Sequence, residues 1–179
     1  MSVTLFQTRL EEQRPETMSG MKFVKESIIR AEPERVFAFH ELPDALERLM
    51  PSWENSRLVQ RAESLRPGSV SIFEARILGL YTARWVAEHT LYDPPRRFED
   101  VMTSGPFRRW RHSHIILPHA SGALLRDEIE YEPPLGILGR IAAPLLITRR
   151  LKRLFDYRHR VTREWCEGGA QGMRGGPSA

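Results

Sequence analysis

Two stretches of alternating residues, FRRWRHSHIIL (107–117) and ALLRDEIEY (123–131), are separated by a short turn that contains Gly122. An alternation of period two is typical of strands with one buried face, and the glycine turn predicts a hairpin. The apolar members of both strands define the inner face, and the larger or polar residues that share it are Trp110, His112, His114, Asp127 and Tyr131. The same rule turns four charged side chains outward, where they can pair across the strands: Arg109, Arg111, Glu128 and Glu130.

Five further segments of strand character precede this hairpin, and a helical pattern follows it. The strands are expected at 23–30, 57–62, 69–78, 83–92 and 98–104. Two short helices follow the first strand, with Pro33 in the first turn of one and Pro43 at the start of the other, which ends before Pro51. From 135 to about 167 the pattern is helical, and Pro144 either kinks this helix or begins its long segment.

The order of these elements predicts an α+β fold. Short strands at regular spacing indicate an antiparallel meander, here a curved sheet of about six or seven strands. One face of such a sheet is apolar and must be covered, and the long C-terminal helix is the element left to cover it. We place this domain at 22–167, with disordered tails at 1–21 and 168–179, which are polar or rich in glycine. A hollow between sheet and helix is geometrically natural.

Length and composition fit a single domain in the cytoplasm. The 179 residues can bury a sizeable core without staples, and a single cysteine, Cys166, suits a reducing compartment. The most apolar stretch, 135–147, is too short for a membrane span and is interrupted by Arg140 and Pro144. The N-terminus lacks the pattern of a signal peptide. We therefore expect a cytoplasmic protein without a membrane span, in an oligomeric state that the sequence leaves open.

The chain carries a net charge of +4, which permits binding to nucleic acid or anionic lipid. The basic residues of the last helix form a stripe along one side: Arg149, Lys152, Arg153, Arg160 and Arg163. No recognised nucleic-acid-binding motif accompanies this stripe. We interpret it as a solvated helix face and expect no nucleic-acid partner.

One charged residue interrupts the apolar stripe of the last helix. The stripe recurs at spacings of three and four through Leu151, Leu154, Phe155, Arg158, Val161, Thr162 and Trp165. Arg158 occupies a position where a leucine would fit, and a guanidinium that faces a core needs a partner. We predict that Arg158 contacts at least one carboxylate of the sheet, with Asp100 and Asp127 as the candidates.

Four motifs carry a resemblance to a known family. They are DPPRRFED (93–100), GPFRRWRHSH (105–114), DEIEYEPPLG (127–136) and FDYRHR (155–160). Together with the order of strand, two short helices, six strands and long helix, they resemble the START-like or helix-grip superfamily. It includes birch-pollen-allergen-like proteins, polyketide cyclases and lipid-transfer domains, and the motifs look like a bacterial cyclase/dehydrase-like branch. The resemblance covers roughly 22–167 and implies a fold more firmly than an activity.

The inner-face residues define a candidate ligand pocket. Strand alternation adds side chains from the earlier strands, and the last helix contributes its apolar stripe. The predicted lining is Phe73, Trp85, His89, Asp100, Met102, Trp110, His112, His114, Asp127, Tyr131, Leu151, Phe155 and Arg158. We expect it to bind or carry a small, largely apolar ligand, such as a small hydrophobic or lipid-like molecule, with the polar residues orienting it.

Two other functions fit the same residues. The inner histidines and aspartates can supply a general acid and base, as a cyclase or dehydratase-like lyase requires, although no catalytic residue is assigned. Alternatively, the polar set satisfies itself and the cavity is collapsed, which gives a structural domain.

Metal and serine chemistry are less favoured by the sequence. The pair His112-x-His114 with Asp127 nearby has the donor types of a zinc site, but a lone pair of histidines is a weak signal. We expect no metal and no cofactor. Ser113 points to the opposite face, which disfavours a serine triad, and Cys166 has no base beside it in the sequence.

Overall fold

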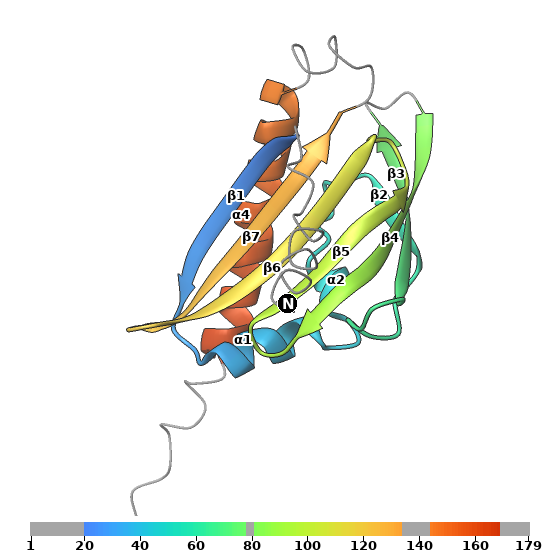
Figure 1. The fold of residues 1–179 in the computed structure, drawn as a ribbon. Coiled ribbons are helices and arrows are strands. Elements are labelled where there is room, and N and C mark those ends of the chain that lie inside the picture. The colour runs from blue at the N-terminus through green and yellow to red at the C-terminus, as the bar shows by residue number, and fades with distance from the viewer. Residues whose placement is uncertain (1–19, 78–80, 134–143, 169–179) are drawn as a thin grey trace, which may run out of the picture.

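The computed structural model describes residues 20–77, 81–133 and 144–168. Its seven strands form one antiparallel sheet in the order β1-β7-β6-β5-β4-β3-β2 (Figure 1). The strands are β1 (Met21–Ile29), β2 (Ser56–Gln60), β3 (Val70–Ile77), β4 (Tyr81–Asp93), β5 (Arg97–Ser104), β6 (Arg109–His119) and β7 (Gly122–Glu132). Strands β2 to β7 form a meander, and β1 adds to it beside β7. The predicted α+β helix-grip architecture is confirmed.

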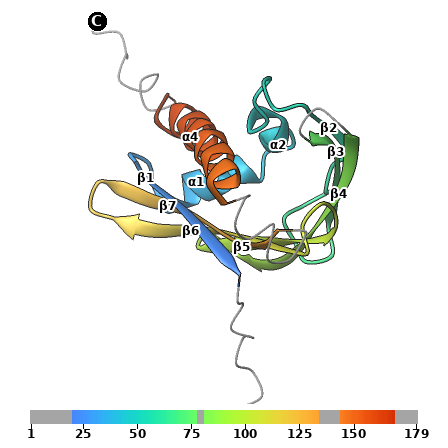
Figure 2. The same cartoon turned by 90° about the horizontal axis from the view of Figure 1, so that it is seen from above.

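Three helices are described: α1 (Pro33–His40), α2 (Ala45–Arg48) and α4 (Pro144–Gly168). Figure 2 shows α4 lying over one face of the sheet, above β1 and β7, while β2, β3 and β4 curve up at the other side. The two short helices follow β1, as predicted, and α1 packs against the C-terminal part of α4 and against β6 and β7. The part of the predicted helix at 135–143 lies outside the described residues.

The turn between β6 and β7 requires glycine. Gly122 has a φ of +132°, a conformation that residues with a side chain rarely adopt. A Cβ atom at this position would also collide with the carbonyl oxygen of Ile29 and the amide nitrogen of Ala31. The close approach of the chain after β1 to this turn therefore depends on Gly122.

The core consists of two apolar clusters on the inner face. The first joins α1 and the C-terminal end of α4 to the sheet, and its buried residues include Val36, Phe39, Ile116, Leu125 and Cys166. The second joins the middle of α4 to β7 through Ile129, Tyr131, Leu151 and Phe155. Burial of this apolar surface is the main force that holds the helix on the sheet.

A layer of polar side chains separates the two clusters. On β7, Asp127 lies between Leu125 of the first cluster and Ile129 of the second. On α4, His159 lies between Cys166 of the first cluster and Phe155 of the second, and its side chain is only 2% exposed. A buried carboxylate and a buried imidazole in facing elements are stable only if they are paired.

The buried stripe of α4 differs from the predicted one by a rotation of the helix. Its fully buried residues are Leu151, Phe155, His159, Thr162 and Cys166, and Arg158 lies at the edge of the stripe. Cys166 is 1% exposed and belongs to the first apolar cluster. Of the predicted tails only Gly20, Met21 and Gly168 are described, and Met21 begins β1 while Gly168 ends α4.

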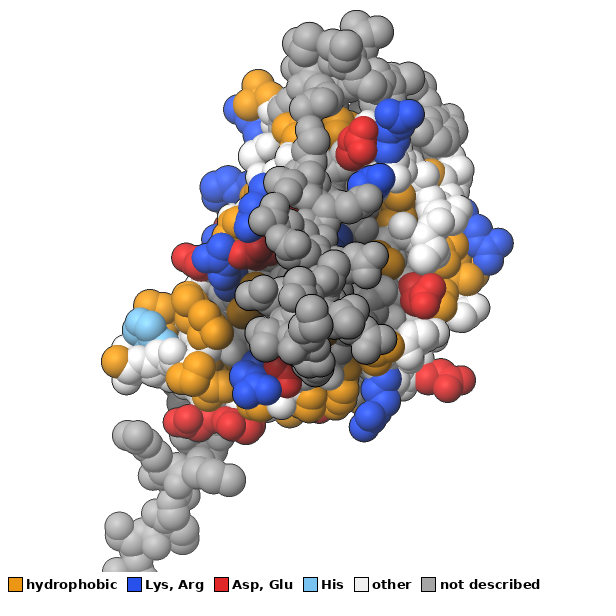
Figure 3. Space-filling model, in the orientation of Figure 1, with side chains coloured by type: hydrophobic (Ala, Val, Ile, Leu, Met, Phe, Trp, Pro, Cys, Tyr) orange, Lys and Arg blue, Asp and Glu red, His pale blue; other side chains and the backbone are white. Residues whose placement is uncertain are grey.

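The outer face of the sheet carries ion pairs between neighbouring strands. Lys22 of β1 lies 2.7 Å from Glu128 of β7, and Arg111 of β6 lies 2.5 Å from Glu130 of β7. Basic and acidic side chains are interspersed on the face shown in Figure 3. Within the described ranges, no helix combines the length and the apolar character that crossing a membrane requires.

Candidate functional site

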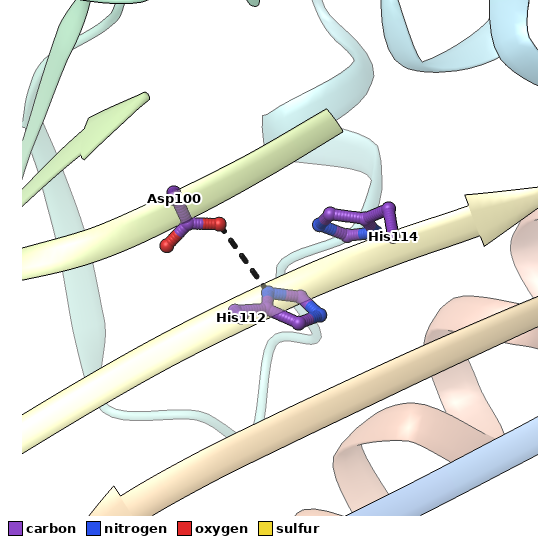
Figure 4. Close-up of side chains that lie close together, drawn as sticks. All are labelled: Asp100, His112 and His114. Atoms are coloured by element: carbon purple, nitrogen blue, oxygen red, sulfur yellow. Dashed lines mark ion pairs between the residues drawn. The ribbon is translucent and has the colours of Figure 1, made fainter. Parts of the chain in front are cut away.

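The register of three strands brings the polar layer together. Asp100 of β5 is paired with His112 of β6, and His114 of β6 is paired with Asp127 of β7. Because alternate residues of a strand face the same side, all four side chains point to the inner face. Figure 4 shows Asp100, His112 and His114 close together on β5 and β6.

Asp127 is the centre of the layer. Its Oδ1 atom accepts a hydrogen bond from Nε2 of His112 at 3.0 Å, and its Oδ2 atom accepts one from Nε2 of His159 at 2.6 Å. Nδ1 of His114 lies 2.6 Å from the same Oδ1 atom. The Asp127 side chain is 4% exposed, so these histidines replace the water that an ionised carboxylate would otherwise bind.

His112 lies between two carboxylates. Its second ring nitrogen, Nδ1, is 3.4 Å from Oδ2 of Asp100, the contact drawn in Figure 4. Burial lowers the pKa of His112, but Asp100 and Asp127 outweigh burial and raise it to about 9. Burial raises the pKa of Asp127, but the histidines around it outweigh burial and hold it well below its usual value. At neutral pH the layer therefore contains an imidazolium flanked by two carboxylates.

The pKa values of three other histidines, His40, His89 and His114, are shifted downward. Burial, reinforced by the positive charge of His112, lowers the pKa of His114 to about 3. Burial also lowers the pKa of His40, on α1, to about 4 and the pKa of His89, on β4, in the same direction. These three imidazoles are neutral at neutral pH. One of them, His89, has a buried Nδ1 atom without a hydrogen-bond partner in the described structure.

The prediction that Arg158 contacts a carboxylate of the sheet is wrong. Its Nε atom donates a hydrogen bond to the carbonyl oxygen of Leu49 at 3.2 Å, and its guanidinium lies over the ring of Phe155. Among the described residues it forms no ion pair. Asp127 and Asp100 do act on it through space, since their charges partly offset the burial that lowers its pKa. The direct helix partner of Asp127 is instead the next residue, His159.

The aromatic part of the predicted pocket lies on the inner face beside the polar layer. Phe73 is paired with Trp85 across β3 and β4, and the Trp85 ring lies edge-on to Trp110, with centroids 4.9 Å apart. Tyr131 and Phe155 are packed in the second cluster with Leu151, whereas the remaining apolar members are half-buried. Those half-buried members are Phe73, Trp85, Met102 and Trp110.

A surface cleft of about 410 Å³ lies elsewhere on the molecule, and none of the predicted pocket residues borders it. Its walls come from the segment after α2, from β3 and from the first turns of α4, and they are Trp53, Glu54, Asn55, Arg76, Arg149, Arg150 and Arg153. Arg150 bonds Glu54, and the Arg153 guanidinium lies over the Trp53 ring. Most of the residues that line this cleft are charged, and it is distinct from the apolar hollow expected from the sequence.

The serine of the His-Ser-His segment belongs to the other face. Ser113 donates a hydrogen bond to Glu99 at 2.6 Å, and Arg97 joins the same group from the outer side. No histidine reaches Ser113 among the residues described, which agrees with the expectation that a serine triad does not form. Possible chemistry in the layer therefore rests on its imidazoles and carboxylates.

The family follows from a comparison with known sequences. A family model described as "Polyketide cyclase / dehydrase and lipid transport" matches residues 29–155, which is more than half of the chain. The chain belongs to this family. No curated protein matched the chain. The matched region includes every strand after β1 and runs to Phe155 of α4, so it contains all of the polar layer except His159.

Solved structures show the same fold. A protein from Thermus thermophilus superposes with a TM-score of 0.61 at 21% identity, covering 79% of this chain and 97% of its own. Ara h 8.0201 gives 0.60 at 13% identity, with 83% and 98% covered. The di-domain ARO/CYC StfQ from the steffimycin biosynthetic pathway gives 0.64 at 11% identity, with 84% and 52% covered. At these identities the likeness concerns the fold alone.

Proposed function

We propose that the protein binds a small, largely apolar molecule on the inner face of the sheet, beside α4. The observation that carries the proposal is the incomplete burial of four large side chains that point to this face: Phe73, Trp85, Met102 and Trp110. Inward-facing aromatic side chains that remain half-buried offer apolar surface to a ligand. The family description, which includes lipid transport, supports the same function.

The polar layer would give this ligand its orientation. Trp110 and His112 are alternate residues of one strand, so the half-buried aromatic surface adjoins the buried charges on the inner face. A hydroxyl, carbonyl or carboxylate on an otherwise apolar molecule would find both donors and acceptors there. The ligand class is thus an apolar body of modest size with one polar group.

A fluorescence titration with N-phenyl-1-naphthylamine, a neutral apolar probe, tests this proposal. We expect saturable binding of one probe per chain, weakened about tenfold by Trp85→Ala, which corresponds to about 1.4 kcal/mol. Trp53→Ala is the matched control, because Trp53 lines the surface cleft instead and should leave the affinity unchanged. Equal weakening by both substitutions would contradict the proposed position. An absence of saturable binding would favour the alternative of a structural domain with a collapsed cavity.

A cyclase or dehydratase-like activity stays a second candidate. The feature that favours it is the separation of pKa values within the layer, with His112 protonated and Asp100 ionised at neutral pH. Such a pair can donate a proton to one atom of a ligand and accept a proton from another. Proton exchange at the carbon next to the carbonyl of 2-tetralone, followed by NMR in D₂O, tests it. Exchange that is no faster with the wild-type protein than with Asp100→Asn would exclude these roles.

A further inference from the structure

Three side chains of the polar layer have the arrangement of metal ligands. One donor atom from each of Asp100, His112 and His114 lies within 4.8 Å of the other two (Figure 4). They come from β5 and β6, adjacent strands of a sheet, which hold their backbones at fixed spacing. Two imidazole nitrogens and one carboxylate oxygen are a common donor set for divalent transition metals.

The distance between Asp100 and His112 is longer than a charge-assisted hydrogen bond and matches the distance between two ligands of one metal ion. Oδ2 of Asp100 and Nδ1 of His112 are 3.4 Å apart, whereas charge-assisted hydrogen bonds between such groups measure about 2.7–2.9 Å. Two ligands on tetrahedral zinc, each bonded at about 2.0–2.1 Å, are separated by about 3.3–3.4 Å. The distance between Oδ2 of Asp100 and Nδ1 of His112 is therefore the distance expected between two ligands of one metal ion.

The opposite side of His112 is supported as metal-bound histidines are. Its Nε2 atom is 3.0 Å from Oδ1 of Asp127, so this nitrogen would keep its proton while Nδ1 gives up its own proton to bind the ion. A carboxylate behind a ligating imidazole orients the ring and strengthens the ligand. Asp127 in turn accepts a hydrogen bond from His159, so the position of this carboxylate also depends on α4.

His114 completes the set from the same strand as His112. It is 9% exposed, and its Nδ1 atom lies 2.6 Å from Oδ1 of Asp127, which orients this ring as it orients His112. Its ring is stacked on Phe98, with centroids 4.0 Å apart and planes 13° apart, so its direction is fixed by packing.

We propose that Asp100, His112 and His114 bind one divalent transition metal ion, with zinc as the expected ion and Asp127 orienting His112. Two carboxylates, Asp100 and Asp127, would balance the charge of the ion in this buried position. Three protein ligands leave a fourth position open, as in zinc sites that act on a small molecule. The metal titration and the probe titration test different side chains, since neither Trp85 nor Trp110 belongs to the metal site.

Calorimetric titration of ZnCl₂ into untagged full-length protein, first stripped with EDTA, tests the site. We expect one zinc ion per chain, an affinity lowered more than about 100-fold by His114→Gln, and one lowered about 10–100-fold by Asp127→Asn. His119→Gln is the matched control, because His119 is an exposed histidine on the same strand and should not change the affinity. The absence of saturable binding, or equal losses in the His114 and His119 variants, would overturn the proposal.

A second measurement on the unmutated protein covers the case in which a variant does not fold. Cobalt(II) in a four-coordinate site with nitrogen and oxygen ligands absorbs visible light strongly, whereas hydrated octahedral cobalt absorbs weakly. We expect the strong spectrum at one equivalent of cobalt and its loss on addition of zinc. A weak, hydrated-type spectrum would overturn the site. Binding of N-phenyl-1-naphthylamine in the same stripped samples reports separately on the proposed ligand-binding function.

Discussion

Nε2 of His159 on α4 lies 2.6 Å from Oδ2 of Asp127 on β7, and this hydrogen bond joins the long helix to the sheet between two apolar clusters. The apolar clusters alone would tolerate sliding of the helix along its axis, since hydrophobic contact has no direction. A single buried polar pair has a defined length and angle. The pair therefore selects one position of α4 on the sheet.

Replacement of His159 by leucine removes this bond and leaves Asp127 with one hydrogen-bond donor fewer. We expect the free energy of unfolding to fall by about 1–3 kcal/mol, the cost of a buried polar group that loses its partner. Urea denaturation in metal-free buffer measures it. Lys152→Ala, on the exposed side of the same helix, should stay within about 0.5 kcal/mol of the wild type. Equal stabilities of the two variants would show that the bond contributes nothing.

The coupling between the two residues is measurable on its own. In a double-mutant cycle of Asp127→Asn and His159→Gln, the two losses should be non-additive by about 0.5–3 kcal/mol. Asp127→Asn combined with Lys152→Ala should be additive, because Lys152 bonds Asp156 and not the polar layer. Additivity in both cycles would mean that Asp127 and His159 act separately.

Gly122→Ala should destabilise the protein more than Gly68→Ala. Both glycines have positive φ angles, +132° and +87°, so both substitutions strain the backbone by about 1 kcal/mol or more. Only at Gly122 would the new methyl group also collide with backbone atoms, those of Ile29 and Ala31. Thermal unfolding of the two variants checks this order. A larger loss at Gly68 would contradict the close approach at the β6–β7 turn.

The thiol of Cys166 should be unreactive in the folded protein. Burial raises its pKa to about 12, and the thiolate is the form that reacts. In buffer at pH 8, a thiol-reactive disulfide reagent should label the folded protein slowly and the urea-unfolded protein at once. Prompt labelling of the folded chain would mean that the C-terminal end of α4 is not packed against α1 as described.

The sequence predicts the sheet more accurately than it predicts the contacts of the long helix. A strand has a period of two, so a single apolar neighbour decides which face a residue shares, and Trp110, His112 and Asp127 were all placed on the inner face correctly. The family resemblance then supplied the order of elements. The pairing of Asp100 with His112 depends on register between strands, which alternation alone does not provide.

The helix is harder to orient from its sequence. Neighbouring residues of a helix are separated by about 100°, so an apolar stripe read from Val161 and Trp165 includes Arg158 and omits His159. The buried stripe has Leu151, Phe155 and His159 at intervals of four residues. That spacing is the feature of the sequence that could have identified His159 as buried. The choice between the two directions is made by docking on the sheet, where Asp127 bonds a residue 32 positions away.

The pairing of β1 with β7 also governs when the domain can fold. In the described sheet β1 has β7 as its only neighbour, and residues 30–121 separate the two strands. Closing so long a loop costs conformational entropy before the strands make any contact. Folds that pair strands far apart in the sequence therefore form slowly. During synthesis on the ribosome, β1 must remain without its neighbour until β7 has left the exit tunnel. Folding of this chain is therefore completed after translation of its last helix, when α4 closes over the finished sheet.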